Sequence, residues 1–109
     1  MRLSEIDFSR YIQGRYLFYS SSFNCYCFLG AAASAAGYDV WAGGVKKDGE
    51  VLRDGRVLGI FEEFQDLTPQ QRERAFVLIV ELNDTEKLTF NQIKDRIPSI
   101  VQEVSREAL

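Results

Sequence analysis

The stretch from Tyr16 to Tyr38 contains no charged residue, and it constrains the fold of this chain more than any other feature. Its apolar part, residues 23–36, is shorter than the ~20 residues that a membrane span requires. Alanine favours helix, and Gly37 follows at the position where helices commonly end in a left-handed residue. The stretch therefore predicts a central buried helix over 23–36, with a small-residue flank around Gly30 that another backbone approaches closely.

Residues 38–64 carry the signals of an antiparallel sheet. Two Asp-Gly pairs, at positions 48–49 and 54–55, are typical of hairpin turns. The pair Gly43-Gly44 indicates a bulge in the first strand. The predicted three-stranded β-meander covers roughly residues 39–46, 50–53 and 56–64.

Polar capping residues predict one helix before this region and one helix after it. Ser4 is expected to cap a first helix that ends at Gly14. Thr68 and Gln71 have the spacing of a capping box, and Pro69 between them suits the first helical position. They predict a helix to about residue 82, although the apolar block 75–80 leaves open whether its second half is partly strand.

The C-terminal segment predicts two shorter helices. Thr89 and Gln92 repeat the capping-box spacing and open a helix that runs to Ile97. Pro98 then interrupts, because proline removes a helical hydrogen bond and clashes with the preceding turn. A final helix is expected over residues 99–108.

These elements predict an α+β fold in which a short antiparallel β-meander packs against a central apolar helix and the C-terminal helices. The 109 residues lie within the usual size of one domain. No linker, repeat or low-complexity tract divides them. We therefore expect a single small domain over 1–109.

The complete absence of histidine limits the chemistry of this chain. Histidine is the usual general base of hydrolases and the commonest zinc ligand, so no complete catalytic set remains, and we expect a non-enzyme without cofactor or metal. The net charge is −3, and residues 62–109 contain ten acidic against six basic side chains. This charge disfavours nucleic acid and favours a protein partner with a basic surface.

The two cysteines indicate whether the chain is in a reducing or an oxidising cellular compartment. Cys25 and Cys27 lie too close in sequence to staple the fold, so we expect reduced thiols. The first residues lack the apolar run of a signal peptide. The sequence therefore predicts a cytoplasmic protein that does not enter a membrane.

A thiol enzyme centred on Cys25 is an alternative. Residues 24–27 precede the alanine-rich stretch, and Gly37, Val40 and Gly44-Val45 follow it, an order that resembles the core of transglutaminase-like and papain-like enzymes. The resemblance covers only this segment and implies a thiol nucleophile near a helix N-terminus. Those families place a histidine on a following strand, and its absence here means that no catalytic role is carried over. Otherwise both cysteines are small buried side chains.

A DNA-binding regulator is the other alternative. The apolar spacing within residues 89–108 resembles a helix-turn-helix, whose second helix enters the major groove. Two departures weaken the resemblance: Pro98 occupies the turn position usually held by glycine, and Lys94 replaces a small residue. Three basic side chains within 89–109 are matched by three acidic ones, so the electrostatic basis for DNA binding is absent.

We expect a small protein-binding module, of the kind represented by inhibitors and immunity proteins, which neutralises a partner by occupying its surface. Glu62, Glu63 and Asp66 cluster between the last predicted strand and the next helix. The sequence favours a solvated edge for these carboxylates, and next to it a contact with a basic partner. A catalytic acid–base pair is the alternative that the sequence supports least. Trp41 is the aromatic side chain that we expect at the binding face. The partner's identity and the oligomeric state stay open.

Overall fold

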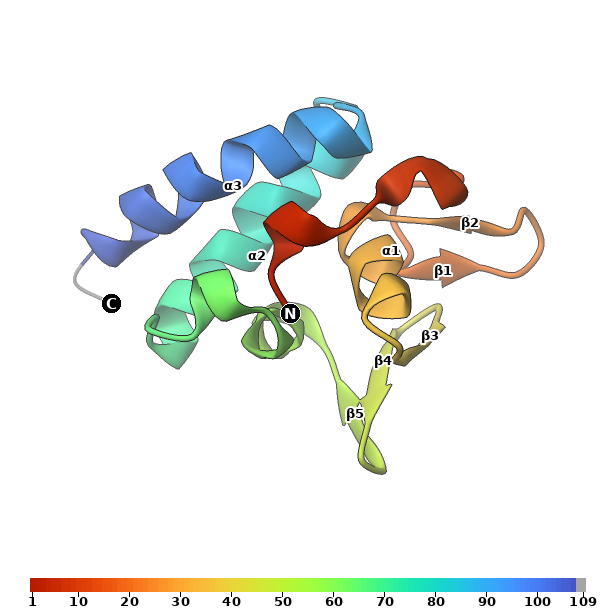
Figure 1. Cartoon of the computed structure of the whole chain (residues 1–109), viewed down its shortest axis with the longest axis horizontal. Coiled ribbons are helices and arrows are strands. Elements are labelled where there is room, and N and C mark those ends of the chain that lie inside the picture. The colour runs from red at the N-terminus through yellow and green to blue at the C-terminus, as the bar shows by residue number, and fades with distance from the viewer. Residues whose placement is uncertain (108–109) are drawn as a thin grey trace.

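Two long helices form one side of the molecule, and short strands around a third helix form the other (Figure 1). The computed structural model describes residues 1–107. The long helices are α2, Pro69–Asp84, and α3, Phe90–Ser105, and the third is α1, Phe28–Ala35. This arrangement confirms the predicted α+β class.

Both long helices begin as the sequence predicts. The Thr68 hydroxyl accepts from the Gln71 N–H at 3.1 Å, and the Gln71 side chain accepts from the Thr68 N–H at 2.9 Å. Thr89 and Gln92 cap each other in the same way. Residues 75–80 are helical throughout, so the second half of this helix is not partly strand.

Helix α3 is continuous through Pro98, and the predicted break there is wrong. A proline inside a helix costs about 3 kcal/mol. Four aliphatic side chains on one face are buried along the whole helix, each worth roughly 1.5–3 kcal/mol, so their packing outweighs that cost. They are Ile93, Ile97, Ile100 and Val104. Pro98 itself is exposed, and residue 108, where the second predicted helix ends, lies outside the described residues.

Helix α1 is the predicted central buried helix, although it begins at Phe28 rather than at residue 23. Its cap is Cys27, whose sulfur accepts from the Gly30 N–H at 3.4 Å. Gly37 follows the helix with φ +92°, as expected for a left-handed terminator. A Cβ at Gly30 would overlap the Phe18 carbonyl oxygen, which confirms the predicted close approach of another backbone.

The sequence analysis missed a two-stranded hairpin before α1. It consists of β1, Tyr19–Ser20, and β2, Cys25–Tyr26, paired antiparallel. Asn24 has φ +49°, a left-handed conformation that asparagine tolerates and that turns the chain into β2. The turn occupies the residues that were predicted to start the helix.

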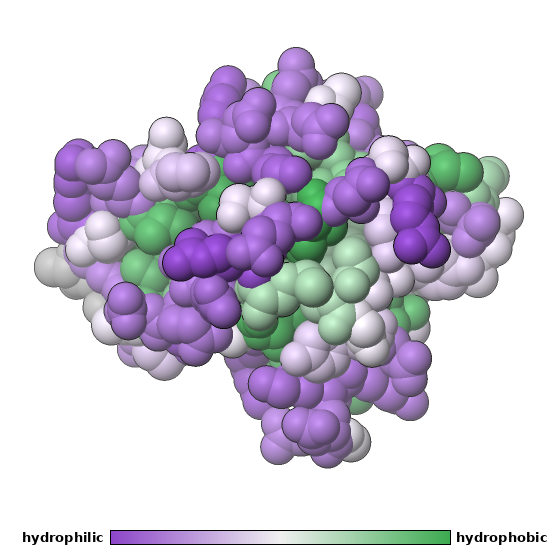
Figure 2. Space-filling view, in the orientation of Figure 1, coloured by the Kyte–Doolittle hydropathy of each residue, from purple (hydrophilic) through white to green (hydrophobic). Residues whose placement is uncertain are grey.

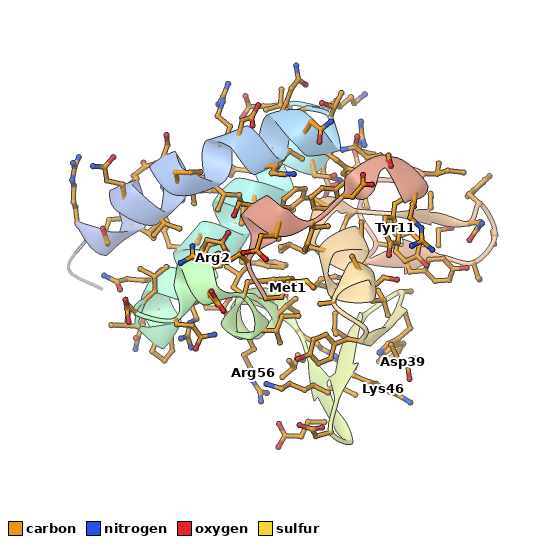
Figure 3. The ribbon with its side chains drawn as sticks, viewed as in Figure 1. Met1, Arg2, Tyr11, Asp39, Lys46 and Arg56 are labelled. Carbon is orange, nitrogen blue, oxygen red and sulfur yellow. The ribbon has the colours of Figure 1, made fainter. Side chains whose placement is uncertain are left out.

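The second sheet has the order β3-β4-β5 and is antiparallel. Its strands are β3, Asp39–Trp41, β4, Gly44–Lys47, and β5, Glu50–Leu52. The first predicted strand, 39–46, is folded in two by a turn at residues 42–43, so the expected bulge is a turn. Asp39 pairs with Lys46 across β3 and β4, and the two side chains project side by side (Figure 3). Residues 48–49 form the predicted hairpin turn.

The predicted third strand, 56–64, is wrong. This segment forms two 3₁₀ helices, η3, Asp54–Ile60, and η4, Glu62–Phe64. Gly55 packs against the backbone of α2 at Glu73, where an added Cβ would come within 2.6 Å of the Glu73 nitrogen. The Gly55 N–H also donates to the Glu73 carboxylate at 3.1 Å. Residues 54–55 thus attach the chain to α2 instead of making a hairpin.

The N-terminal segment also differs from its prediction. In place of a helix capped by Ser4 it forms two 3₁₀ turns, η1, Leu3–Glu5, and η2, Phe8–Arg10. The Asp7 carboxylate accepts from the Ser9 N–H at 3.0 Å, and this local bond starts η2. The bond also lowers the pKa of Asp7.

One hydrophobic core joins the two sides of the molecule. The side chains of Phe28, Phe61 and Phe64 are its largest fully buried members. On the face that Figure 2 shows, hydrophilic residues dominate the outline and a hydrophobic strip lies near the centre. None of the helices within residues 1–107 combines the length and apolarity that crossing a bilayer demands.

Candidate functional site

A cleft of about 410 Å³ lies where α2 meets the N-terminus of α1, the segment 16–18 and the β3–β4 turn. Small-molecule and side-chain sites in proteins commonly have volumes of this order. The lining is mainly apolar and comes from segments far apart in the sequence (Figure 1). Its apolar walls include Leu17, Phe18, Leu29, Phe76, Ile79 and Val80.

Two phenylalanines form an aromatic wall of this cleft. The rings of Phe18 and Phe76 lie 6.2 Å apart, centroid to centroid, with 32° between their planes. Phe18 is fixed by its backbone, because its carbonyl lies against Gly30 and its N–H donates to the Ala42 carbonyl at 3.3 Å. The wall is therefore in place before any ligand enters.

Exposed apolar side chains border the cleft. Tyr16 is 78% exposed and Leu17 is 44% exposed, although both line the cleft. Trp41 is 40% exposed and precedes the lining residues Ala42 and Gly43. The structure thus places the predicted aromatic residue, Trp41, beside the cleft. We call Tyr16, Leu17 and Trp41 the apolar rim.

The Trp41 ring is itself held in place. The Arg53 guanidinium carbon lies 5.7 Å from the ring centroid, which is within the range of a cation–π contact. One face of the indole is occupied in this way. Arg53, which directly follows β5, therefore supports the orientation of the Trp41 side chain in the rim.

The floor of the cleft contains the buried polar side chain Asn83, which is 1% exposed. Its Oδ1 accepts from the Gln13 side chain at 2.9 Å and from the Phe28 N–H at 3.2 Å. Its Nδ2 donates to the Gly14 carbonyl at 3.0 Å and to Asp84 Oδ1 at 2.7 Å. An amide side chain has two acceptor and two donor positions, so all four are used.

Two carboxylates, Asp54 and Asp84, also line the cleft. Asp84 Oδ1 accepts from the Tyr16 N–H at 3.0 Å and thereby holds the rim residue. Asp54 is exposed and has φ +54° at the start of η3. No lysine or arginine is among the described residues that line this cleft, so its lining carries only negative charge.

The thiol at the N-terminus of α1 is that of Cys27, and not that of Cys25. Cys25 lies in β2 and packs against Gly14, so the helix N-terminus belongs to Cys27 instead. Burial raises the pKa of the Cys27 thiol to about 12. The N–H groups of the first helical turn act in the opposite direction and are outweighed. At neutral pH Cys27 is a protonated thiol and a weak nucleophile.

The predicted acidic cluster serves contacts within the molecule. The Glu63 carboxylate accepts from the backbone N–H groups of Leu3 at 2.8 Å and Ser4 at 3.0 Å. Glu62 forms an exposed ion pair with Arg2 at 3.1 Å. Asp66 is exposed at the end of this segment. These three residues lie apart from the residues that line the cleft, whereas Trp41 lies beside it.

Of the predicted helix-turn-helix pair over 89–108, the described part, to residue 107, contains one continuous helix, Phe90–Ser105, in place of two helices and a turn. Lys94, which departs from the helix-turn-helix pattern, instead anchors the N-terminal segment. Its ammonium donates to the Ile6 carbonyl at 2.9 Å and lies 5.9 Å from the centroid of the Phe8 ring.

The sequence analysis missed most residues of this site. Tyr16 and Leu17 carry no pattern that separates them from core residues, and Asp54 was assigned to a hairpin turn. Asn83 and Asp84 lie just past residue 82, where the predicted helix ends, and so fall outside any predicted site. One signal was available: a polar pair directly after an apolar block is a candidate for a buried polar contact.

Within residues 1–107, no three His, Cys, Asp or Glu side chains lie close enough together to hold a metal ion. Comparison of the chain with protein-family models, with curated protein sequences and with solved structures finds no match. The geometry of the cleft is therefore the basis for assigning a function.

Proposed function

We propose that this chain is a protein-binding module of the inhibitor or immunity type, which binds a partner with a basic surface through the cleft and its apolar rim. A single observation carries the proposal: exposed apolar side chains border a preformed cleft in which, among residues 1–107, the charged lining groups are carboxylates. Exposed aromatic side chains at a cleft are typical of interface anchors, and the charge suits a cationic partner.

The rigidity of the cleft supports the same function. Binding costs free energy when loops and side chains must be ordered first. Here the Tyr16 N–H is held by Asp84, Trp41 is held by Arg53, and Asn83 fixes the floor. A surface that is ordered in advance loses little of its interaction free energy on binding.

The proposed compartment is the cytoplasm. Its support is chemical, because Cys25 and Cys27 are both free thiols. Oxidising compartments favour disulfides in small domains.

The test begins with an affinity purification of the tagged chain from its native cells, with nuclease present, and mass spectrometry of the proteins retained. Binding of the purified partner is then measured by calorimetry. Trp41→Ala and Leu17→Ala are each expected to weaken binding by about tenfold or more, as at other interface anchors.

Phe23→Ala is the matched control, because Phe23 is 80% exposed on the β1–β2 turn and does not line the cleft. We expect this variant to bind within about twofold of the unmodified chain. The proposal fails if the rim variants bind as tightly as the unmodified chain, if Phe23→Ala weakens binding equally, or if the chain is recovered only alone.

A further inference from the structure

We propose that the cleft is a receptor for one lysine or arginine side chain of the protein partner. This inference rests on the proposed function and names the chemistry of the occupant. In this arrangement the aromatic wall contacts the apolar stem of the side chain. The carboxylates bind its cationic head.

The stem of such a side chain matches the walls. Lysine and arginine carry three or four methylene groups that pack on apolar surfaces while the charged head reaches a polar site. Leu17, Phe76 and Val80 supply apolar surface along the cleft. Phe18 and Phe76 both line the cleft, and the face of an aromatic ring attracts a cation.

The cationic head matches the carboxylates. Both hydrogen bonds that Asp84 accepts from the protein use Oδ1, from the Tyr16 N–H and from the Asn83 amide. Its Oδ2 forms no hydrogen bond or ion pair within residues 1–107. A carboxylate fixed through one oxygen presents the other to a ligand at little entropic cost.

Asp54 adds a second negative charge from another direction. It lies at the start of η3, and its side chain forms no ion pair or hydrogen bond with another described residue. A carboxylate at the edge of a partly dehydrated cleft attracts a cation more strongly than one on an open surface. An acidic occupant would be repelled by both groups, and a purely apolar one would leave both without a cationic partner.

The test uses four blocked pentapeptides, Gly-Leu-Xaa-Leu-Gly, with lysine, arginine, norleucine or glutamate at Xaa. Norleucine keeps the apolar stem of lysine and lacks the ammonium. Binding to the full chain is followed through the backbone amide NMR signals of Phe18, Phe76 and Asp84. The lysine and arginine peptides are expected to bind about fivefold more tightly than the norleucine peptide, and the glutamate peptide most weakly.

The variants Asp54→Asn and Asp84→Asn are expected to remove most of the difference between lysine and norleucine. Asparagine keeps a carbonyl oxygen that can accept the two bonds of Asp84, and it tolerates the left-handed φ of Asp54. Asp48→Asn is the matched control, because Asp48 has φ +50° in the β4–β5 turn and does not line the cleft. This control is expected to leave the difference unchanged.

Two outcomes overturn the inference. If the norleucine and lysine peptides bind equally at the cleft, the site is apolar without a preference for cations, and the proposed function stands. If the lysine peptide causes no shifts at about 5 mM, the cleft does not receive the side chain at useful strength. The proposed function is then judged separately, by the affinity of Trp41→Ala and Leu17→Ala for the purified partner.

Discussion

The C-terminal half of the molecule, residues 54–105, is built from local interactions, whereas the N-terminal half, residues 1–53, depends on side chains from the other half. Helices α2 and α3 each begin with their own capping box. Strands β1 to β5 are two to four residues long. Strands this short are marginal on their own.

Long-range hydrogen bonds hold the N-terminal half in place. Glu63 caps the first turn, Lys94 binds the Ile6 carbonyl, and Asn83 binds both Gly14 and the start of α1. The partners in these bonds are 55 to 88 residues apart in the sequence. The difference teaches that one half folds according to its own sequence, while the other half takes its shape from the surface on which it packs.

The largest effect is expected for Gly30→Ala, inside the N-terminal half, where helix α1 lies against the backbone of Phe18. An added Cβ would overlap the Phe18 carbonyl oxygen, and backbone cannot move aside as a flexible side chain would. We expect the free energy of unfolding to fall by about 3 kcal/mol or more, measured by urea denaturation. Gly43→Ala is the control, because its Cβ meets only the Trp41 ring at 3.8 Å. Equal stability of the two variants would contradict the close approach.

Asn83→Ala tests the polar link between the halves. The substitution leaves the Phe28 N–H without its acceptor, whereas the Gly14 carbonyl still accepts from the Arg15 guanidinium at 3.1 Å. Unsatisfied buried groups of this kind cost about 1–3 kcal/mol, so we expect a loss near 2 kcal/mol in thermal or urea unfolding. Asn91→Ala, at an exposed position of α3, is expected to change stability by less than about 0.5 kcal/mol. If Asn83→Ala lowered the free energy of unfolding by no more than Asn91→Ala does, the polar link would contribute little to stability.

The smallest effect is expected in the locally determined half. Thr89→Ala removes the hydroxyl that accepts from the Gln92 N–H and leaves the helix otherwise intact. Loss of such a cap costs about 1 kcal/mol. The matched control is Thr85→Ala, since Thr85 is an exposed residue at the end of α2. If Thr89→Ala destabilised the chain more than Asn83→Ala, the contrast between the halves would be reversed.

The accuracy of the sequence-based predictions follows the range of the interactions that decide each element. The starts of α2 and α3 were predicted because a capping box is read within four residues. Pro98 was misleading, because the burial of one continuous face decides the helix and that burial depends on α2. Residues 54–55 were misleading because an Asp-Gly pair favours a turn in any context, while its use against α2 depends on tertiary packing.

The candidate site was predictable only in part. Trp41 was selected because a tryptophan beside two glycines is a plausible exposed anchor, and it lies beside the cleft. Asp54 and Asp84 are 30 positions apart, and only the packing of η3 and α1 on α2 brings both to one cleft. Clustering along the sequence drew attention to Glu62 and Glu63, which the fold uses to hold its own N-terminus.

Because one amide, that of Asn83, closes hydrogen bonds to several separate segments, these segments cannot loosen one at a time. We therefore expect residues 13–16 and the first turn of α1 to open as one cooperative unit. The mouth of the cleft, bordered by Tyr16, is then either closed or released as a whole, without intermediate shapes. In hydrogen-exchange experiments the amides of Tyr16 and Phe28 are expected to share one opening free energy, and unequal values would show that the segments move independently.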